Sequence, residues 1–151
     1  MNNNENTELE ELEQDEPEEL DEQDEQGSSA EDEREPLADP GAVGREIARV
    51  LSDKKAEDVI MLDIRSVSVI ADYFIIATGN SERQIRALYR EVDEQMGNRG
   101  VRLRHNEGKQ DSGWVLLDYG DVIVHIFGPQ ERAYYRLERL WSNAPVVLSI
   151  Q

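Results

Sequence analysis

The sequence contains no cysteine among its 151 residues, so disulfide bridges, thiolate zinc sites and cysteine nucleophiles are excluded. It also has no apolar run near the roughly 20 residues that a membrane-spanning helix needs. Its start lacks the basic and apolar stretches of a secretory signal, and its many acidic residues are the opposite of an organellar transit peptide. We therefore expect a protein of a bacterial-type cytoplasm that does not enter a membrane.

Basic residues are too few for a general nucleic-acid-binding surface. The chain has 34 acidic and 16 basic residues and a formal net charge of −18. This imbalance lies at one end, because residues 1–40 hold 18 of the acidic residues and one basic residue and carry −17, whereas residues 41–151 carry −1. A nearly neutral domain lacks the overall positive charge that is typical of domains that bind DNA or RNA.

The first 40 residues are mainly Glu, Asp, Gln and Asn with scattered leucines. Such a segment buries too little apolar surface to offset the ordering of its backbone, which costs about 1–2 kcal/mol per residue. We predict that residues 1–40 are a disordered acidic N-terminal tail and that residues 41–151 form one folded domain. The tail is either an arm that binds a partner or mimics nucleic acid, or a solubilising, steric segment, and blocks of like charge are more often the second.

The remaining sequence predicts a mixed α/β domain. Apolar residues at helical spacing and runs of β-branched and aromatic residues give the order α-β-β-α-β-β-β-α. Helices are expected over 42–53, 81–96 and 129–141, and strands over 59–64, 72–78, 101–104, 114–119 and 121–127. We expect a small single domain with a mixed β-sheet flanked by helices, in which the first two strands are antiparallel.

Three local details belong to this prediction. Ser81 and Gln84 fit a capping box at the start of the second helix, in which each side chain accepts the other's backbone amide. Residues 105–113 are expected to be a polar loop. In the third helix the expected apolar face comprises Tyr134, Leu137, Leu140 and Trp141, and the expected solvent-facing side comprises Arg132, Arg136 and Arg139.

The clearest local pattern is W-V-L-L-D-Y-G-D-V-I-V-H-I-F, from Trp114 to Phe127. Two apolar runs flank a short turn in which Gly120 permits the positive φ of a tight reversal. In the expected β-hairpin, side chains alternate between faces. One face receives Trp114, Leu116 and Asp118 from the first strand and Asp121, Ile123, His125 and Phe127 from the second. Both faces carry apolar residues, so we expect cover on both sides, with a helix and a partner as the candidates.

Residues that are candidates for catalysis lack the surrounding patterns that catalysis needs. The turn at Gly79–Ser81 leads into a helix, where anions are favoured, but it lacks both nucleotide-binding glycine patterns and is more simply a capped turn. Asp118 and Asp121 are candidate ligands for a divalent cation, although Asp side chains at turns commonly bond nearby backbone. His125 lies in an apolar strand with no nucleophile beside it. The sequence therefore favours a binding domain without catalytic, cofactor-binding or metal-binding residues.

Five arginines give a local exception to the neutral charge. Arg83, Arg86 and Arg90 share the second helix, and Arg102 and Arg104 follow on the next strand. They would support a peripheral contact with RNA. A solvated helix face is the more common explanation of such a pattern.

Four blocks of sequence, in a fixed order and spacing, form a specific signature. They are D-V-I-M-L-D-I (58–64), A-D-Y-F-I-I-A-T-G-N-S-E-R-Q-I (71–85), the hairpin segment (114–127) and R-A-Y-Y-R-L-E-R-L-W (132–141). Together they resemble the ribosomal silencing factors, the RsfS or Iojap family, over roughly residues 42–145. Residues 1–40 lie outside the resemblance.

The resemblance implies a domain related to the nucleotidyltransferase fold and a function without catalysis. Members of this family bind the large ribosomal subunit through its ribosomal protein fourteen (uL14) and sterically block association with the small subunit. This represses translation under nutrient limitation or in stationary phase. The Gly-Ser and paired-Asp pattern of true nucleotidyltransferases is not recognisable in this sequence.

We predict that the hairpin carries the partner-binding surface. Protein interfaces favour an apolar or aromatic centre with a polar rim, and carboxylates would complement a basic ribosomal protein. The predicted contact residues are Trp114, Leu116, Asp118, Tyr119, Asp121, His125, Phe127 and Tyr135. Plain core packing is the alternative for Trp114 and Phe127. The same surface would support a weak homodimer that competes with ribosome binding.

Two other functions stay open at this point. One is a divergent nucleotidyltransferase that uses Asp118, Asp121 and the turn at Gly79–Ser81, and thermal stabilisation by magnesium and nucleotide would favour it. The other is an adaptor whose acidic tail recruits a basic partner, and binding that is lost at moderate salt would favour that function.

Overall fold

One sheet of six strands carries the fold, in the spatial order β3-β4-β5-β2-β1-β6. This computed structural model describes residues 35–151, and Pro36–Gln151 form one compact unit. The strands are β1 (Glu57–Asp63), β2 (Tyr73–Thr78), β3 (His105–Glu107), β4 (Trp114–Asp118), β5 (Val122–Phe127) and β6 (Val146–Ile150). The helices are α3 (Pro40–Asp53), α4 (Glu82–Asn98), the short 3-10 helix η2 (Gln110–Ser112), α5 (Pro129–Tyr135) and α6 (Leu137–Leu140). The predicted disorder of the acidic tail falls almost entirely on residues 1–34, outside the described residues.

The sheet is mixed because its two central strands run parallel. β2 and β5 pair in register from Tyr73–Val122 to Thr78–Phe127, whereas the other neighbouring strands pair antiparallel. All residues of β2 and β5 are buried, as expected for inner strands with cover on both faces. The predicted mixed sheet flanked by helices is therefore confirmed, and so is the antiparallel pairing of β1 with β2. The relationship to the nucleotidyltransferase fold stays a prediction.

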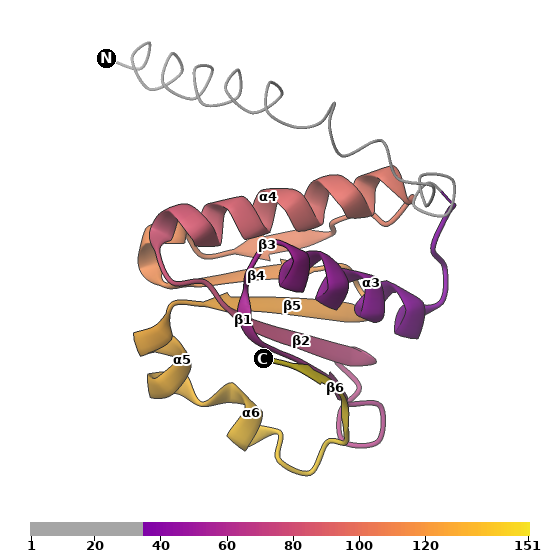
Figure 1. Ribbon diagram of the computed structural model, residues 1–151. Coiled ribbons are helices and arrows are strands. Elements are labelled where there is room, and N and C mark those ends of the chain that lie inside the picture. Colours follow the sequence, from indigo (N-terminus) through magenta and orange to yellow (C-terminus); the bar gives the residue numbers. More distant parts are fainter. Residues whose placement is uncertain (1–34) are drawn as a thin grey trace. The chain divides into compact units, whose positions relative to one another are not determined.

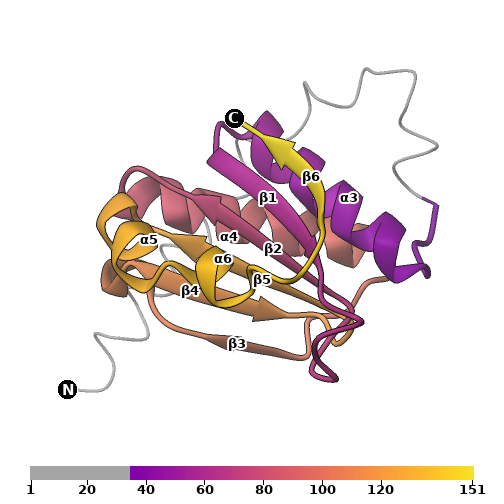
Figure 2. The same ribbon diagram turned by 90° about the horizontal axis from the view of Figure 1, so that it is seen from below.

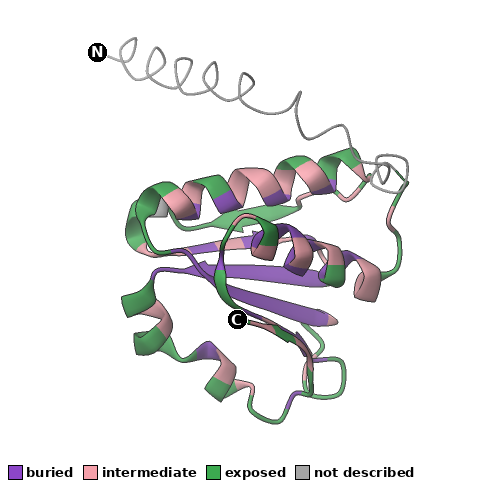
Figure 3. Ribbon diagram, in the orientation of Figure 1, coloured by how far each residue is buried: buried purple, intermediate pink, exposed green. Residues whose placement is uncertain are grey.

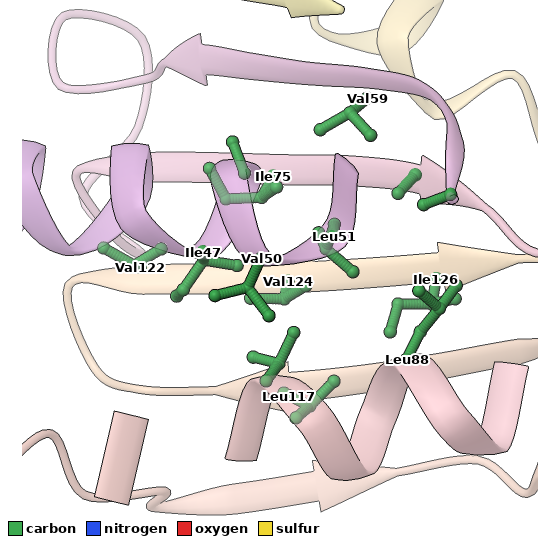
Figure 4. Packing of buried hydrophobic residues seen from close by; sticks show 14 of the residues in the cluster. Ile47, Val50, Leu51, Val59, Ile75, Leu88, Leu117, Val122, Val124 and Ile126 are labelled. Carbon is green, nitrogen blue, oxygen red and sulfur yellow. The ribbon is translucent and has the colours of Figure 1, made fainter. Parts of the chain in front are cut away.

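Helices α3 and α4 cover one side of the sheet, called here the α3–α4 face (Figure 1). Each helix begins at a side-chain cap, because the Asp39 carboxylate accepts the amide of Ala42 and the Ser81 hydroxyl accepts the amide of Gln84, both at 3.0 Å. The buried apolar residues that follow at helical spacing are Val43, Ile47, Val50 and Leu51 on α3 and Ile85, Leu88, Val92 and Met96 on α4. Figure 4 shows several of them against aliphatic side chains of the strands.

The capping box predicted at α4 is half correct. Ser81 caps the helix as expected, but the Gln84 side chain accepts the amide of Asn80 at 2.7 Å and not that of Ser81. Its amide group donates to the Lys55 carbonyl at 2.9 Å. Gln84 therefore also ties the start of α4 to the turn that follows α3, and this long-range bond accounts for the difference.

The opposite side, called here the α5–α6 face, is covered less completely. Leu137 is the single buried residue of α5 and α6. Together with Ala144 and the half-buried Trp141 it packs on Phe74 and other residues of the inner strands. Figure 2 shows α5 and α6 crossing this side, and Figure 3 shows that both helices are largely exposed whereas β2 and β5 are buried.

The strand predicted over residues 101–104 is wrong. The strand that follows α4 is instead β3, which lies within the predicted polar loop of residues 105–113 and pairs antiparallel with β4. β4 ends at Asp118, whose carbonyl still accepts the amide of Arg104 at 2.8 Å, and the ladder has no partner for the preceding residues. The alternation of side chains is nevertheless present, because Val101 and Leu103 are half-buried and the two arginines of the segment are exposed.

The third predicted helix is two short helices. Arg136 has a φ of +48°, a left-handed conformation that ends α5 and separates it from α6. The change in direction leaves Tyr134 and Leu140 80% and 75% exposed, although both were expected on the apolar face.

Arg132 was expected on the solvent-facing side and is not there. Its guanidinium is largely buried and donates to the Thr78 hydroxyl at 2.9 Å and to the Glu138 carboxylate at 2.7 Å. These bonds tie α5 and α6 to the end of β2, so Arg132 is part of the connection between the helices and the sheet.

The sequence pattern does not predict β6. This strand pairs antiparallel with β1, from Ile150 opposite Val59 to Val146 opposite Leu62, and forms an edge of the sheet. It is short and only half-buried, so its apolar pattern is weak. Within residues 35–151, no helix combines the length and the apolar composition that crossing a membrane requires.

Candidate functional site

Aromatic rings gather on the α5–α6 face at the ends of β4 and β5. Trp114 packs on Phe127 with ring centroids 4.9 Å apart and on Tyr135 of α5 at 4.6 Å. Phe74 of β2 meets His125 edge-on at 4.8 Å. Tilted and edge-to-face contacts of this kind stabilise beyond the area that they bury. The cluster therefore holds its rings in defined positions along the sheet.

The register of the β4–β5 hairpin brings these side chains together. Opposite pairs are Trp114 with Phe127, Leu116 with His125 and Asp118 with Ile123. Residues that pair across an antiparallel ladder point to the same face. The predicted hairpin is therefore confirmed, and so is the predicted division between two faces for the residues of β4 and β5, whereas Asp121 lies in the turn and not on the strand.

Five of the eight predicted contact residues lie together in this cluster, namely Trp114, Leu116, His125, Phe127 and Tyr135. Asp118 shares their face at the far end of β4, and Asp121 is exposed in the turn. Tyr119 lies on the opposite face, where its hydroxyl donates to Asp93 of α4 at 3.2 Å. Burial, followed by the nearby Asp93 carboxylate, raises the pKa of Tyr119.

Burial separates the supporting residues of the cluster from those at its surface. Phe127 is fully buried and His125 is 4% exposed, so both lie beneath the surface. Trp114 and Leu116 are half-buried, and Tyr135 is 44% exposed. The core alternative considered for Phe127 therefore agrees with its burial, whereas Trp114 is shared between core and surface.

His125 fixes the orientation of Trp114. Its Nδ1 accepts the indole N–H of Trp114 at 3.3 Å, which assigns the imidazole proton to Nε2. Burial lowers the pKa of His125 to about 4, so the ring is neutral at neutral pH. Nε2 has no hydrogen-bond partner among the residues of the described range. His125 is therefore a buried structural residue that orients the Trp114 side chain.

The surface extends beyond the predicted residues onto α5. Tyr134 contacts Tyr135 edge-on at 5.0 Å and is 80% exposed. We call Trp114, Leu116, Tyr134 and Tyr135 the aromatic strip. Sequence reasoning did not assign Tyr134 to a surface, because a continuous helix would have placed it on the buried side. A sequence signal for the helix break would have been needed to find it.

The turn of the hairpin is held by its own side chains. The Asp118 carboxylate accepts the amide of Gly120 at 2.7 Å, and Gly120 has a φ of +93°. The expectation that a turn Asp bonds nearby backbone is therefore confirmed for Asp118. Among residues 35–151, no group of three or more His, Cys, Asp or Glu side chains is placed to hold a metal ion.

At the candidate anion site, the turn Gly79–Ser81, the structure has a small hollow of about 200 Å³, and its lining includes the acidic residues Glu82, Asp111 and Glu131. A Cβ at the buried Gly79 would lie 2.8 Å from the Ile85 side chain. Beside this turn, the Glu131 carboxylate lies so close to Gly128 that a Cβ there would meet it at 2.6 Å. A carboxylate at the start of α5 takes the position that favours anions and repels phosphate. This geometry does not favour a nucleotide site.

The arginines of the predicted basic patch lie on two elements. Arg83 is exposed and Arg86 half-buried on α4, whereas Arg102 and Arg104 are exposed on the segment between α4 and β3. The Arg104 guanidinium lies against Gly120 of the hairpin turn. A contact of this patch with RNA stays a prediction.

The fold and this face define a small α/β domain with an exposed aromatic strip, which suits binding to another macromolecule. The family model described as "Ribosomal silencing factor during starvation" (RsfS) matches residues 36–151. The chain belongs to the RsfS family of ribosomal silencing factors. The family predicted from the four sequence blocks is therefore confirmed.

Individual relatives agree with this assignment. The ribosomal silencing factor RsfS of Bacillus subtilis is 46% identical over 99 residues, which are 66% of this chain and 84% of that protein. The chloroplastic protein Iojap of Arabidopsis thaliana is 34% identical over 117 residues, 78% of this chain and 47% of that protein. A solved structure of a Chromobacterium violaceum protein is 35% identical with a TM-score of 0.67 and covers 70% of this chain and 88% of its own.

Proposed function

We propose that this protein represses translation by binding the large ribosomal subunit through its ribosomal protein fourteen (uL14) and sterically blocking association with the small subunit under nutrient limitation. Family membership supports the ribosome as the partner. The observation that supports the place of contact is the aromatic strip, which Asp118 follows two residues after Leu116 on β4, with Asp121 exposed in the turn beyond. The proposed role is regulatory and not catalytic, and it needs no cofactor or metal.

The aromatic strip has the properties of a binding centre. Trp and Tyr side chains bury a large area at a small entropic cost, and they are enriched among the residues that dominate binding energies. Trp114 is already held between Phe127 and Tyr135 and by its bond to His125, so binding would order it little further. Carboxylates at the rim complement the positive charge typical of ribosomal proteins.

The structure refines the predicted contact set. We assign direct contact to Trp114, Leu116, Tyr135, Asp118 and Asp121. The buried His125 and Phe127 support these residues from beneath. Tyr119 acts only through the turn, because its side chain packs on the α3–α4 face.

Silencing by steric block is a competition for one site. The silencing factor must occupy the large subunit before the small subunit does, so its affinity multiplied by its concentration decides the outcome. Each change of about 1.4 kcal/mol at the interface changes occupancy tenfold in the unsaturated range. The proposed activity is cytoplasmic, as expected for a factor that acts on the ribosomes of a bacterial cell.

A subunit-joining assay tests the proposal. The purified protein is mixed with bacterial large subunits, small subunits are added, and the products are separated on a sucrose gradient. We expect the protein to sediment with the large subunits and the joined peak to fall with dose. A protein that stays at the top of the gradient while joining is unaffected would contradict the proposal.

The contact surface is tested by Trp114→Ala and Asp121→Arg in the same assay. We expect each variant to bind the large subunit at least roughly tenfold more weakly, as for residues at the centre or the charged rim of an interface. Asp111→Arg, an exposed charge reversal in η2, is the matched control. Circular dichroism and thermal unfolding verify that each variant is folded. Wild-type binding by both folded variants would place the contact elsewhere.

Two weaker contacts complete the proposal. A homodimer through the aromatic strip would compete with the ribosome, and sedimentation equilibrium should show weak association that Trp114→Ala reduces. A peripheral contact of Arg83 and Arg86 with rRNA should make binding to the large subunit more sensitive to salt than binding to isolated uL14. Equal salt dependence would remove the RNA contact from the proposal.

A further inference from the structure

A hollow of about 590 Å³ lies at the end of the molecule where α3 begins. One wall is the segment Leu37–Pro40, and the other is the segment from Gly100 to Arg104 that joins α4 to β3. Val43, Tyr119 and Val122 contribute most of the remaining apolar lining. The hollow is within the size range of ligand-binding clefts, roughly 300–1,000 Å³. Its residues are separate from the aromatic strip.

We call this hollow the groove. One of its walls, the segment from Val101 to Arg104, has the side-chain pattern of a strand but is not paired with another strand. In the described part of the chain, the amide of Val101 donates to the Met96 carbonyl and that of Arg104 to the Asp118 carbonyl, whereas the amides of Arg102 and Leu103 donate to no group. The segment leads directly into β3, and its side chains alternate between half-buried and exposed. Unpaired backbone beside an edge strand is a template for adding a peptide as a further strand.

The same wall carries two free positive charges. Arg102 and Arg104 are exposed, and neither forms an ion pair within residues 35–151. The Arg104 guanidinium is so close to the Gly120 backbone that a Cβ there would meet it at 2.7 Å. Asp121 is the single carboxylate of the lining. Residues two apart in an extended chain lie on the same side, about 6.6 Å apart. The two guanidinium groups therefore match carboxylates at alternate positions of an extended peptide.

From these observations we propose that the groove between Leu37–Pro40 and Val101–Arg104 binds an extended peptide of a partner protein, with acidic residues alternating with small apolar ones. The peptide backbone bonds the free groups of either Arg102 or Leu103, because consecutive amides of an extended segment point to opposite edges. Its apolar side chains enter the hollow, and its carboxylates meet the two arginines. The groove shares Asp121 with the proposed contact with the large ribosomal subunit, whereas the aromatic strip lies outside the groove.

RNA fits the groove less well than an acidic peptide does. The lining includes apolar side chains such as Leu37, Val43 and Val122, and the Asp121 carboxylate would repel phosphate. Two arginines neutralise few phosphates, whereas affinity for nucleic acid grows with the number neutralised. Free backbone amides beside an edge strand favour recognition of a peptide, because an extended peptide can add to the sheet through main-chain hydrogen bonds.

The test uses the full-length protein and fluorescein-labelled peptides in a fluorescence anisotropy titration at low salt. The probe is acetyl-Glu-Val-Glu-Val-Glu-amide, and the control is the same peptide with lysine in place of glutamate. A third peptide carries N-methyl groups on both valine amides, which removes backbone donors without changing charge. We expect the acidic probe to bind, the lysine peptide not to bind, and the N-methylated peptide to bind at least roughly tenfold more weakly.

Matched variants locate the site. Arg102→Glu with Arg104→Glu should weaken probe binding by roughly tenfold or more, whereas Arg45→Glu with Arg139→Glu, the same charge change at exposed positions outside the groove, should alter it less than about twofold. In the wild-type NMR spectrum the probe should shift the amide signals of Arg102, Leu103 and Leu37. Both double variants should keep wild-type thermal unfolding and wild-type sedimentation with large subunits, so a failure here is distinct from a failure of the silencing function.

Three results would overturn the proposal. The first is equal binding of the glutamate and lysine peptides. The second is binding of a ten-nucleotide RNA with the same dependence on Arg102 and Arg104, which would make the groove a nucleic-acid site. The third is no probe binding together with a change in self-association when the two arginines are reversed, which would make a second copy of the chain the occupant.

Discussion

The two faces of the sheet are built from different side chains and are closed to different degrees. On the α3–α4 face, Leu117, Val124 and Ile126 are fully buried beneath two long, capped helices. On the α5–α6 face, the same hairpin presents the half-buried Trp114 and Leu116. The helices there have seven and four residues.

This difference shows how one strand serves stability on one side and recognition on the other. Densely packed aliphatic side chains fix the fold, whereas rings left partly exposed are available to a partner. The buried side-chain atoms that lack a partner in the described range, His125 Nε2 and Glu138 Oε1, belong to the α5–α6 side. Each such atom costs about 1–3 kcal/mol. The α5–α6 face is therefore expected to open first.

Adjacent leucines of β4 give the largest test of this comparison. Leu117→Ala on the α3–α4 face should lower the free energy of unfolding by about 2–5 kcal/mol, because it leaves a cavity in a sealed core. Leu116→Ala should cost less than about 1.5 kcal/mol, because that side chain is half-exposed, but it should weaken binding to the large subunit. Urea unfolding and gradient sedimentation measure the two effects. Equal losses of stability would contradict the division between the faces.

The pH dependence of stability sharpens the comparison on the α5–α6 side. The pKa of His125 is lowered by burial to about 4, below the ordinary value of 6.5, so the unfolded chain binds this proton first as pH falls. Its contribution to stability is full above pH 6.5 and is lost as pH falls toward 4, by about 3 kcal/mol in total. Urea unfolding between pH 7 and 4.5 measures the loss. His125→Phe, which cannot titrate, should show a shallower dependence, and parallel profiles would argue against it.

Arg132 tests how the two short helices are attached. Arg132→Met removes the bonds to Thr78 and Glu138 and should cost about 1–2 kcal/mol of unfolding free energy. The loss should appear as faster hydrogen exchange in α5 and α6, with little change in α3 and α4. Arg139→Met, at an exposed position of α6, should cost less than about 0.5 kcal/mol. Exchange that speeds up equally in all four helices would show that Arg132 stabilises the whole domain.

The smallest expected effect is at the junction between α5 and α6. Arg136 has a φ of +48°, a conformation that glycine adopts more readily than arginine. Arg136→Gly should therefore change the free energy of unfolding by less than about 1 kcal/mol, in the stabilising direction. Thermal unfolding of the two proteins measures it. A clear loss of stability would mean that the contacts of the arginine side chain outweigh the backbone strain.

Local patterns were sufficient for the elements that meet at the α3–α4 face. Capped helices with apolar stripes and the buried strands β2 and β5 carry their signals within a few residues. The β6 edge strand is half-buried, and its signal is correspondingly weak. The strand forms at β3 and not at the predicted residues 101–104, because only residues opposite β4 can pair with it. The length of β4 therefore decides which residues become a strand, and the sequence of the segment itself does not contain this information.

For the candidate site, the sequence predicted on which face of the sheet each side chain lies. It did not predict which of these side chains are exposed to solvent. Alternation along a strand placed Trp114 and Phe127 on one side of the sheet. Which of them reaches the surface depends on where α5 lies, and α5 is set by the break at Arg136 and by the bond from Arg132 to Thr78. Tertiary contacts of this kind leave no periodic signal in the sequence. The assignment of Tyr134 failed for the same reason.

The parallel pair at the centre of the sheet also orders the steps by which the chain folds. β1 with β2, and β4 with β5, are antiparallel neighbours along the chain, so each pair can form early as a local hairpin. β2 and β5 are separated in sequence by α4, β3 and β4, and closing that loop costs entropy before any contact of the central ladder forms. We therefore expect the two hairpins to form first and to join along β2 and β5. The rate-limiting step of folding would then be the pairing of β2 with β5, the two central strands against which the helices of both faces pack.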